Sequence, residues 1–598
     1  MPQTQHQGSL KPILDLQVYE PAKPARPKDQ GIKVEPSFYL PMATNTPYFP
    51  PQYNPYWPNF QSQFLQPIIK TYNINALGPV ADHTKISTVY EDVLPTKQFM
   101  NTMNTLSERL EINEFVRSVL IKQHDGEDIN LDGKGQNSLL SYLKFMELNP
   151  YNEDPLTNNP YMSLPNDMLI YRSCYPIRYD DRSGEIQCSP NSIGMNIRIY
   201  RLSDIEYNIK NQPDKNSLKC NVWREVAYYE YIKEQIIRKK ICPNFVMLYG
   251  YYISENSNID FDKIARIKKT FNPITNPVGK DLVCTNKAII LLTEAPVYNI
   301  YGWSTKTYKP LGNVKKMVNT GFHSTKVWLS VLFQLMTAMY VMQIHNIIFD
   351  NFTVTDNVYI KDITRHENIT NYWKYKIDGL EYYVPNYGYL VLIDSNYKDK
   401  KTENLLIKTG INNNYKIYGS IFGDVAVNKY AHDMFKQNIS MNSFTKAFIN
   451  HGGVPPPADI KKKLDDIMMA TVADNSIGTY ISKFMREFLN NRVGTYLTET
   501  EAKKVRKTEP PNFTKGQIVV HEIQSETYKF VIFLENLPTG KTSILTKNDS
   551  DENIMEDEIS KGLLFNYSKA DKVVQNYKPN DTNLNDDELL ETYIINKN

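Results

Sequence analysis

The sequence predicts an α+β protein built around a two-lobed core, and three observations lead to this fold class. Short apolar runs of strand length fill residues 166–310 around one amphipathic helix. From Val327 onward the apolar residues follow the helical period instead. Ahead of the core lies a Pro- and Tyr-rich segment in which proline disfavours both helix and sheet. We therefore expect a two-lobed core with an extended N-terminal arm, a small helical segment and a short C-terminal β element.

The composition excludes several classes of protein. The chain has 598 residues, of which 68 are Lys or Arg and 66 are Asp or Glu, so a general polyanion binder is excluded. A hydrophobic content of 41% excludes a wholly disordered chain, and the length predicts several domains. The cysteines lack CxxC spacing, and we expect buried free thiols rather than a metal site. The five cysteines are Cys174, Cys188, Cys220, Cys242 and Cys284.

Residues 1–80 form the predicted arm. Between Tyr48 and Phe64 prolines alternate with aromatic residues, so the backbone should be extended and cannot build a core of its own. Because exposing so many rings to water is costly, we expect residues 45–70 to lie against the core or against a neighbouring protein. A solvated linker is the alternative.

Residues 81–165 are predicted to be a helical segment. Apolar residues recur at helical spacing around Leu106–Leu120, and a second helix is expected from Ser138 through Leu148. Between the two, Asp128–Gly135 matches the first half of a calcium-binding loop, but Leu139 stands where a bidentate Glu is needed. A solvated turn and a calcium site both remain open, with the turn favoured.

The remaining boundaries follow from changes in pattern. We expect a smaller, strand-rich lobe over 166–310 and a larger, helical lobe over 311–500. The apolar stretch Val327–Phe349 is interrupted by polar residues and should be a buried helix rather than a membrane span. No apolar run typical of a signal peptide begins the sequence. Residues 501–547 predict a strand pair, and residues 548–598 an acidic, polar tail that is mobile or binds a partner.

The order of segments in the core resembles that of protein kinases. The helix NVWREVAYYEYIKEQI is followed by CPNFVMLYGYYI, by the buried strand KAIILLTEAP, by a long apolar helix and by the strand GYLVLID. The resemblance covers roughly residues 170–500. The long insert NYWKYKIDGLEYYVPNYGYLVLID and the richness in Asn, Lys and Ile look like the kinase-like proteins of giant DNA viruses.

This resemblance implies a nucleotide site with unusual residues. Glu225 matches the helix Glu of the family, Glu294 ends the strand that leads into the hinge, and Tyr200 stands where the family has its lysine. Arg198, two residues earlier, is the candidate replacement for that lysine. The stretch expected to form the phosphate cradle has only Gly184 and Gly194 instead of three glycines.

The catalytic loop departs further from the family. Asn351 takes the position of the catalytic Asp, and an amide cannot accept the substrate proton as a carboxylate does. A shift of one residue would make Asp350 the base. Asn357 and Asp394 match the two metal-binding positions, which matter only if a nucleotide–metal complex binds.

Three functions follow as alternatives. The favoured one is a degenerate kinase-like protein, a pseudokinase, that serves as a binding or structural component of a giant-virus particle or an infected-cell complex. The others are an active atypical serine/threonine kinase that uses Asp350 and Asp394, and a virion structural protein unrelated to kinases.

No cofactor is established, and ATP with Mg²⁺ or Mn²⁺ is the only ligand that the resemblance implies. We expect other viral proteins, including capsid or virion components, as partners through the arm. Neither a membrane span nor strong nucleic-acid binding is expected. The expected location is the virion or the host cytoplasm, with a soluble chain in a reducing compartment.

Overall fold

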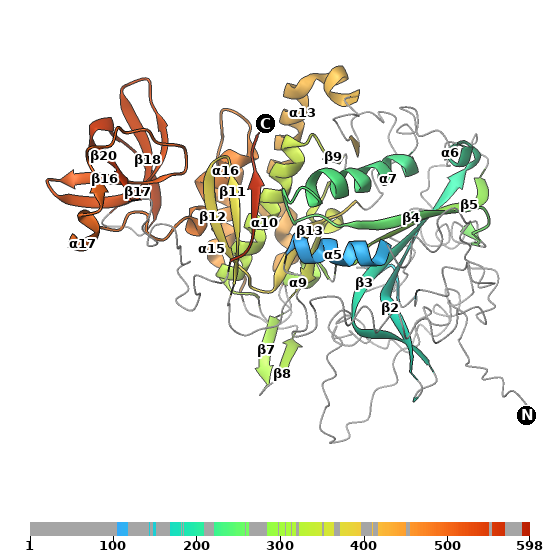
Figure 1. Cartoon of the computed structure of the whole chain (residues 1–598). Helices are drawn as coiled ribbons and strands as arrows, with labels where there is room; N and C mark the ends of the chain where they lie inside the picture. The colour runs from blue at the N-terminus through green and yellow to red at the C-terminus, as the bar shows by residue number, and fades with distance from the viewer. Residues whose placement is uncertain are drawn as a thin grey trace, which may run out of the picture.

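The structure is a computed structural model of the whole chain (Figure 1). The residues that it describes are 105–117, 143, 147–150, 168–180, 182, 185–208, 221–257, 259–261, 284–296, 298–304, 307–311, 314–318, 322–349, 352–363, 371–395, 409–410, 417–449, 455–548, 553–568 and 589–597. The predicted arm at 1–80 and the calcium-like loop at 128–135 lie outside these residues and stay predictions.

A five-stranded antiparallel sheet forms the first part of the core, as the sequence predicts. Its strand order is β1-β2-β3-β5-β4, so β5 pairs with both β3 and β4, and β4 lies at the edge of the sheet. The strands are β1 (Glu147–Leu148), β2 (Met168–Asp180), β3 (Glu185–Ser203), β4 (Leu248–Ser254) and β5 (Cys284–Glu294). The stretch expected to form a phosphate cradle lies within the β2–β3 hairpin and not in a glycine-rich loop. The stretch has only Gly184 and Gly194, as the sequence shows, and the degenerate cradle stays a prediction.

A helix lies beside strand β4 of this sheet (Figure 1). Helix α7 (Asn221–Tyr231) continues as the π-helical turn η8 (Ile232–Ile237), in agreement with the helix expected over 221–236. Val222, Val226 and Tyr229 are buried on one side of it, because residues three or four apart share a helix face. We call the sheet, α7 and η8 the sheet part.

The helical segment ahead of the sheet is partly as expected. Helix α5 (Leu106–Val116) begins at Thr105, whose side chain and Glu108 form a capping box. The second predicted helix is wrong at its end, because Glu147–Leu148 pairs with β2 as strand β1. Leu143 has no regular structure.

A central buried helix organises the second part of the core. Helix α10 (Thr325–Ile344) is the one helix of the described residues that is long and apolar enough to cross a membrane, but 83% of its apolar stretch is buried inside the protein. Leu332, Leu335 and Met336 are fully buried, as expected for a core helix. Figure 1 shows it surrounded by other helices and strands.

The helices that follow complete what we call the helical part. They are α13 (Ile417–Asn438), α14 (Met441–Phe444), η9 (Thr445–Phe448), α15 (Ala458–Met469), α16 (Ile477–Phe484) and η10 (Arg486–Phe488). The short helix α6 (Asp204–Asn208) connects β3 to α7, and four short elements lead from β5 to α10: β6 (Tyr298–Asn299), α9 (Ile300–Ser304), β7 (Thr307–Leu311) and β8 (Val314–Val318). One continuous hydrophobic cluster joins α5, the sheet, α7, α10 and α16.

Three small sheets are formed by strands that follow α10, one of them together with β6. Strands β10 (Val358–Asp362) and β13 (Tyr389–Ile393) are antiparallel and β6 extends their sheet. The long insert between them is a hairpin of β11 (Tyr372–Ile377) and β12 (Leu380–Pro385), and β21 (Leu589–Ile595) from the end of the chain adds to β11 in parallel. The loop after α10 contains β9 (Ile348–Phe349), which pairs with β14 (Thr409–Gly410), and α11 (Val354–Asn357).

The six-stranded domain stands at one side of the helical part, away from the five-stranded sheet (Figure 1). The expected strand pair is β16 (Ile518–Gln524) with β17 (Thr527–Asn536). The other elements are α17 (Glu499–Ala502), β15 (Val505–Arg506), β18 (Lys541–Lys547), β19 (Ile554–Ser560), η11 (Lys561–Leu563) and β20 (Leu564–Tyr567). Gly516 (φ 86°) lets the backbone approach the β11–β12 turn, since a Cβ there would meet the Gly379 oxygen at 1.9 Å.

The prediction of a mobile tail from residue 548 is wrong where strands form. Strand β19 carries the acidic residues and pairs with β18, and β21 buries Tyr593 and Ile595 in the core. The acidic side chains of an edge strand point away from the backbone groups that form the hydrogen bonds of the sheet. A charged sequence is therefore compatible with a strand.

One disulfide bond joins Cys174 of β2 to Cys188 of β3. The expectation of free thiols is therefore wrong for these two residues, because the hairpin brings their Cα atoms to 5.9 Å. Cys242 is free and buried. A bridge of this kind also differs from the expectation of a purely reducing compartment.

Candidate functional site

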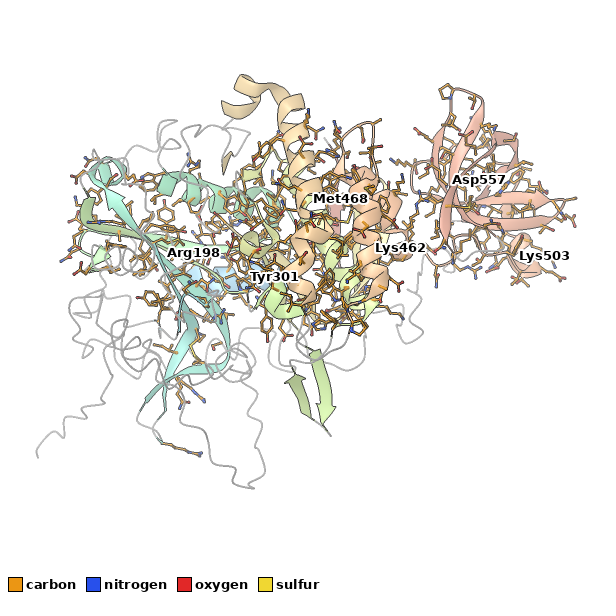
Figure 2. The ribbon with its side chains drawn as sticks, turned by 180° about the vertical axis from the view of Figure 1, so that it is seen from behind. Arg198, Tyr301, Lys462, Met468, Lys503 and Asp557 are labelled. Atoms are coloured by element: carbon orange, nitrogen blue, oxygen red, sulfur yellow. A yellow bond between two sulfur atoms is a disulfide. The ribbon has the colours of Figure 1, made fainter. Side chains whose placement is uncertain are left out.

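The candidate site lies where the sheet part meets the helical part. Arg198 of β3 donates from Nη2 to the Asp394 carboxylate, which directly follows β13. It also donates from Nη1 to the Ser395 backbone oxygen at 2.9 Å and from Nε to Thr293 Oγ1 at 3.1 Å. Both charged side chains are 1% exposed. The prediction that Arg198 and Asp394 share one site agrees with this ion pair (Figure 2 labels Arg198 on the sheet).

A second carboxyl group stands beside this pair. Arg198 and Tyr200 share one face of β3 because side chains alternate along a strand. The Tyr200 hydroxyl donates to Glu225 Oε1 at 3.1 Å, and the Ser395 hydroxyl donates to Glu225 Oε2 at 2.6 Å. The Tyr229 hydroxyl donates to Asp394 Oδ1 at 2.5 Å. We call this group the central cluster: Arg198, Tyr200, Glu225, Tyr229, Thr293, Asp394 and Ser395.

Asn357 lies next to the central cluster, but its side chain forms hydrogen bonds with backbone groups and not with side chains of the cluster. Its Nδ2 donates to the Asp394 backbone oxygen at 2.9 Å, and its Oδ1 accepts from the Thr353 amide at 3.0 Å. The amide therefore holds the loop that contains α11 against the end of β13. Asp350 and Asn351, the predicted catalytic residues, lie outside the described residues and stay predictions.

The protonation of the central cluster follows from burial. Burial raises the pKa of Asp394 to about 6, and Glu225 adds to the rise, while Arg198 and Tyr229 oppose it. Burial also raises the pKa values of Tyr200 and Tyr229 well above that of an ordinary tyrosine, so both hydroxyls stay protonated and donate. The central cluster thus holds two carboxyl groups and one guanidinium, which is paired with Asp394.

Glu294 does not join this cluster. Arg109 of α5 donates from Nη2 to Glu294 Oε2 at 2.6 Å, and Lys361 of β10 donates to Glu294 Oε1. Arg109 also donates to the backbone oxygens of Pro243 and Phe245. Burial alone would raise the pKa of Glu294, but Arg109 and Lys361 outweigh it and lower the pKa to about 2. We call these three charged residues the Glu294 cluster.

The residues present do not fit a nucleotide-bound metal ion. Both Asp394 oxygens already accept from Arg198 and Tyr229, and the Asn357 amide is used by the backbone. Among the described residues no group of three or more His, Cys, Asp or Glu side chains could hold a metal. A metal at the Asp394 carboxylate would have to displace the Arg198 guanidinium from it.

Sequence reasoning missed several members of the two clusters. Arg109 lies in a predicted helix and Lys361 follows the predicted catalytic loop, and nothing in the sequence marks either as a partner of Glu294. Tyr229 is noticeable only as part of an apolar helix stripe. Their partners come from distant positions, such as the 185 residues between Arg109 and Glu294. A buried charge needs a partner, so Glu294 at the end of an apolar strand is the one signal that could have prompted a search.

The fold and the site define an α+β protein with two buried ion clusters at the junction of its two parts. The chain is similar to uncharacterized protein R403 of Acanthamoeba polyphaga mimivirus, with 36% identity over 656 aligned positions that span 99% of this chain and 86% of the relative. The chain belongs to the family of this mimivirus protein, which associates it with giant viruses. No protein-family model matches the chain.

Proposed function

We propose that the chain is a kinase-like giant-virus protein that binds other proteins and does not transfer phosphate. The order of its elements supports the kinase relationship. A five-stranded antiparallel sheet with helix α7 precedes the buried helix α10, the loop with α11, strand β10, the β11–β12 hairpin and strand β13, which Asp394 follows. The resemblance of the sequence to protein kinases implies the same order.

The observation that carries the proposal is the Tyr200–Glu225 hydrogen bond. In phosphoryl transfer a lysine paired with the helix Glu holds the phosphates of the nucleotide. A tyrosine hydroxyl that stays protonated has no positive charge to offer a phosphate. The carboxyl group is thus held in place by hydroxyl groups of Tyr200 and Ser395, in a geometry that supports folding rather than catalysis.

The proposed role is structural or scaffolding within a virus particle or an infected-cell complex. The predicted arm, residues 45–70, would dock on another viral protein such as a capsid or virion component. The Cys174–Cys188 bridge favours a particle over a reducing cytoplasm, because disulfides persist at virion surfaces and are rare in the cytosol.

A radiolabel transfer assay with ATP and Mg²⁺ or Mn²⁺ tests the proposal. We expect no phosphate transfer to protein substrates, and no rise in melting temperature at about millimolar ATP, where a ligand of the native state would stabilise it. The control is the Asp394→Asn variant, which should behave as the native chain does. Robust transfer that is lost in Asp350→Asn or Asp394→Asn would instead establish the active atypical kinase.

Limited proteolysis tests the proposed docking of the arm. We expect the segment from Tyr53 to Phe64 to be cleaved more slowly in the assembled particle than in the isolated chain, because a docked segment is inaccessible to protease. Equally rapid cleavage in both would show that the arm docks nowhere. An unrelated virion protein, the remaining alternative, is favoured if an experimental structure separates Glu225 from Asp394.

A further inference from the structure

Strands β7 and β8 form a two-stranded ribbon that stands apart from the rest of the fold. They pair with each other in antiparallel fashion, and no other described strand extends their sheet. Figure 1 shows the ribbon projecting from the body of the molecule, and Figure 2 shows the same projection from behind. Because a two-stranded ribbon is only marginally stable by itself, a partner that packs along it would stabilise it.

The charge of this region has one sign. Residues 295–349 contain five lysines and no Arg, Asp or Glu, although the whole chain is almost neutral. Three of the five, Lys309, Lys315 and Lys316, lie on the ribbon itself. The pairing places Lys309 directly opposite Lys316, and like charges in directly opposite positions destabilise a pair of strands. An anionic partner would remove this repulsion.

We propose that the β7–β8 ribbon binds the phosphate backbone of double-stranded DNA. Each strand has five residues and spans about 17 Å, and the major groove, about 12 Å wide, admits a two-stranded ribbon. Lys309 and Lys316 share one face of the ribbon and Lys315 lies on the other, since successive residues of a strand alternate. Phosphates line both walls of a groove, whereas a flat acidic protein surface would meet only one face.

This DNA site is separate from the central cluster and goes beyond the proposed function, in which the partners are proteins. A chain with 68 basic and 66 acidic residues has no general affinity for polyanions. A local concentration of lysine on one projecting element can still supply the contacts, because the partner meets the ribbon and not the average surface.

Fluorescence anisotropy of the full chain with a labelled DNA duplex of about 20 base pairs and mixed sequence tests the proposal. Each lysine–phosphate contact makes the logarithm of the binding constant fall by about 0.9 per tenfold rise in salt. In Lys309→Gln/Lys315→Gln/Lys316→Gln we expect this slope to shrink by about 2–3 and Kd to rise about tenfold or more at about 50 mM salt. Arg at the same three positions keeps the charge and should preserve binding.

Three exposed lysines elsewhere supply the matched control. They are Lys462 of α15, Lys503 after α17 and Lys561 of η11, and Figure 2 labels the first two. The variant Lys462→Gln/Lys503→Gln/Lys561→Gln removes the same total charge, so a general effect of net charge would weaken both triple variants equally. We expect this control to keep Kd within about twofold of the native value. Equal weakening of the two triple variants would overturn the proposal, as would a native chain that shows no binding at about 0.1 mM protein.

Two further ligands separate DNA from other polyanions. Double-stranded RNA of the same length should bind more weakly, because its major groove is too deep and narrow for the ribbon. Poly-L-glutamate of matched charge should also bind more weakly, because it has no groove with phosphates on both walls. If either ligand binds more tightly than DNA and loses binding in Lys309→Gln/Lys315→Gln/Lys316→Gln, the DNA assignment is overturned. None of these results depends on phosphate transfer or on the central cluster.

Discussion

The central cluster and the Glu294 cluster are both buried, yet their carboxyl groups behave in opposite ways. In the central cluster two carboxyl groups, Glu225 and Asp394, stand with one guanidinium, which is paired with Asp394, and the pKa of Asp394 is raised to about 6. In the Glu294 cluster one carboxylate faces Arg109 and Lys361, and its pKa is lowered to about 2. Burial alone would raise both values, so burial does not explain the difference.

The balance of charges explains it. A buried group of charges shifts its pKa values in the direction that reduces the excess charge. The central cluster has one more acid than base, so proton uptake is favoured. The Glu294 cluster has one more base than acid, so its carboxylate stays ionised, and the pKa of Lys361 is lowered by burial with Arg109 adding to the effect. The carboxyl groups of Asp394 and Glu294, which look alike in the sequence, therefore contribute to stability in different ways.

The largest expected effect is that of Arg198→Met. It leaves Glu225 and Asp394 side by side without a cation, and breaking a buried pair in this way costs about 3–5 kcal/mol. Chemical denaturation at neutral pH measures the loss, with Arg201→Met as control. A loss below about 1 kcal/mol would mean that the central cluster does not depend on this charge.

Glu294→Gln should come next. A carboxylate whose pKa falls from 4.5 to about 2 on folding stabilises the protein by about 3 kcal/mol, and the amide removes that contribution. The half-buried pair Lys374–Glu381 supplies the control, since Glu381→Gln should cost less than about 1 kcal/mol. Equal losses for the two variants would contradict the charge-balance explanation.

The pH dependence of the two clusters should have opposite signs. The pKa of Asp394 rises from 3.8 to about 6 on folding, so its contribution to stability is full below the lower value and is lost as pH rises through the higher one. Compared with Asp394→Asn, the native chain should lose about 3 kcal/mol across this window. Compared with Glu294→Gln, its advantage should instead hold above 4.5 and shrink as pH falls toward 2. Parallel denaturation curves would refute the assignment.

The smallest effect should come from a surface pair in the six-stranded domain. Arg506 and Glu509 form an ion pair with side chains 48% and 41% exposed. Arg506→Ala should change stability by less than about 0.5 kcal/mol, because water and salt screen exposed charges. A loss of stability comparable to that of Glu294→Gln would show that the size of the effect depends on the number of charges nearby, and not on burial together with the balance of charges.

Several elements could be predicted from the sequence because their signals are local. The apolar periodicity around Leu332 predicts the buried helix α10, and the stripe of Val222, Val226 and Tyr229 predicts α7. The β16–β17 pair follows from two apolar runs around a polar turn. The end of the chain could not be predicted, because β21 is stabilised by β11, more than 200 positions away.

Part of the candidate site was also predictable. Arg198, Glu225 and Asp394 were identified by their order along the chain, and the structure brings them together. Glu294 was identified as well, but its side chain turns to Arg109 and Lys361 instead. Order along the chain indicates which strands and helices meet, whereas the face on which a side chain lies depends on the register of each strand.

The amino-acid sequence by itself determined the α+β class, the buried central helix and the presence of a tyrosine, Tyr200, where kinases have a lysine, because these depend on residue type and local periodicity. Only the tertiary structure decided which charge balances which. Arg198 reaches Asp394 and Arg109 reaches Glu294 across separations of 196 and 185 residues. Buried charges must find partners wherever the packed chain brings them, and no local pattern records that choice.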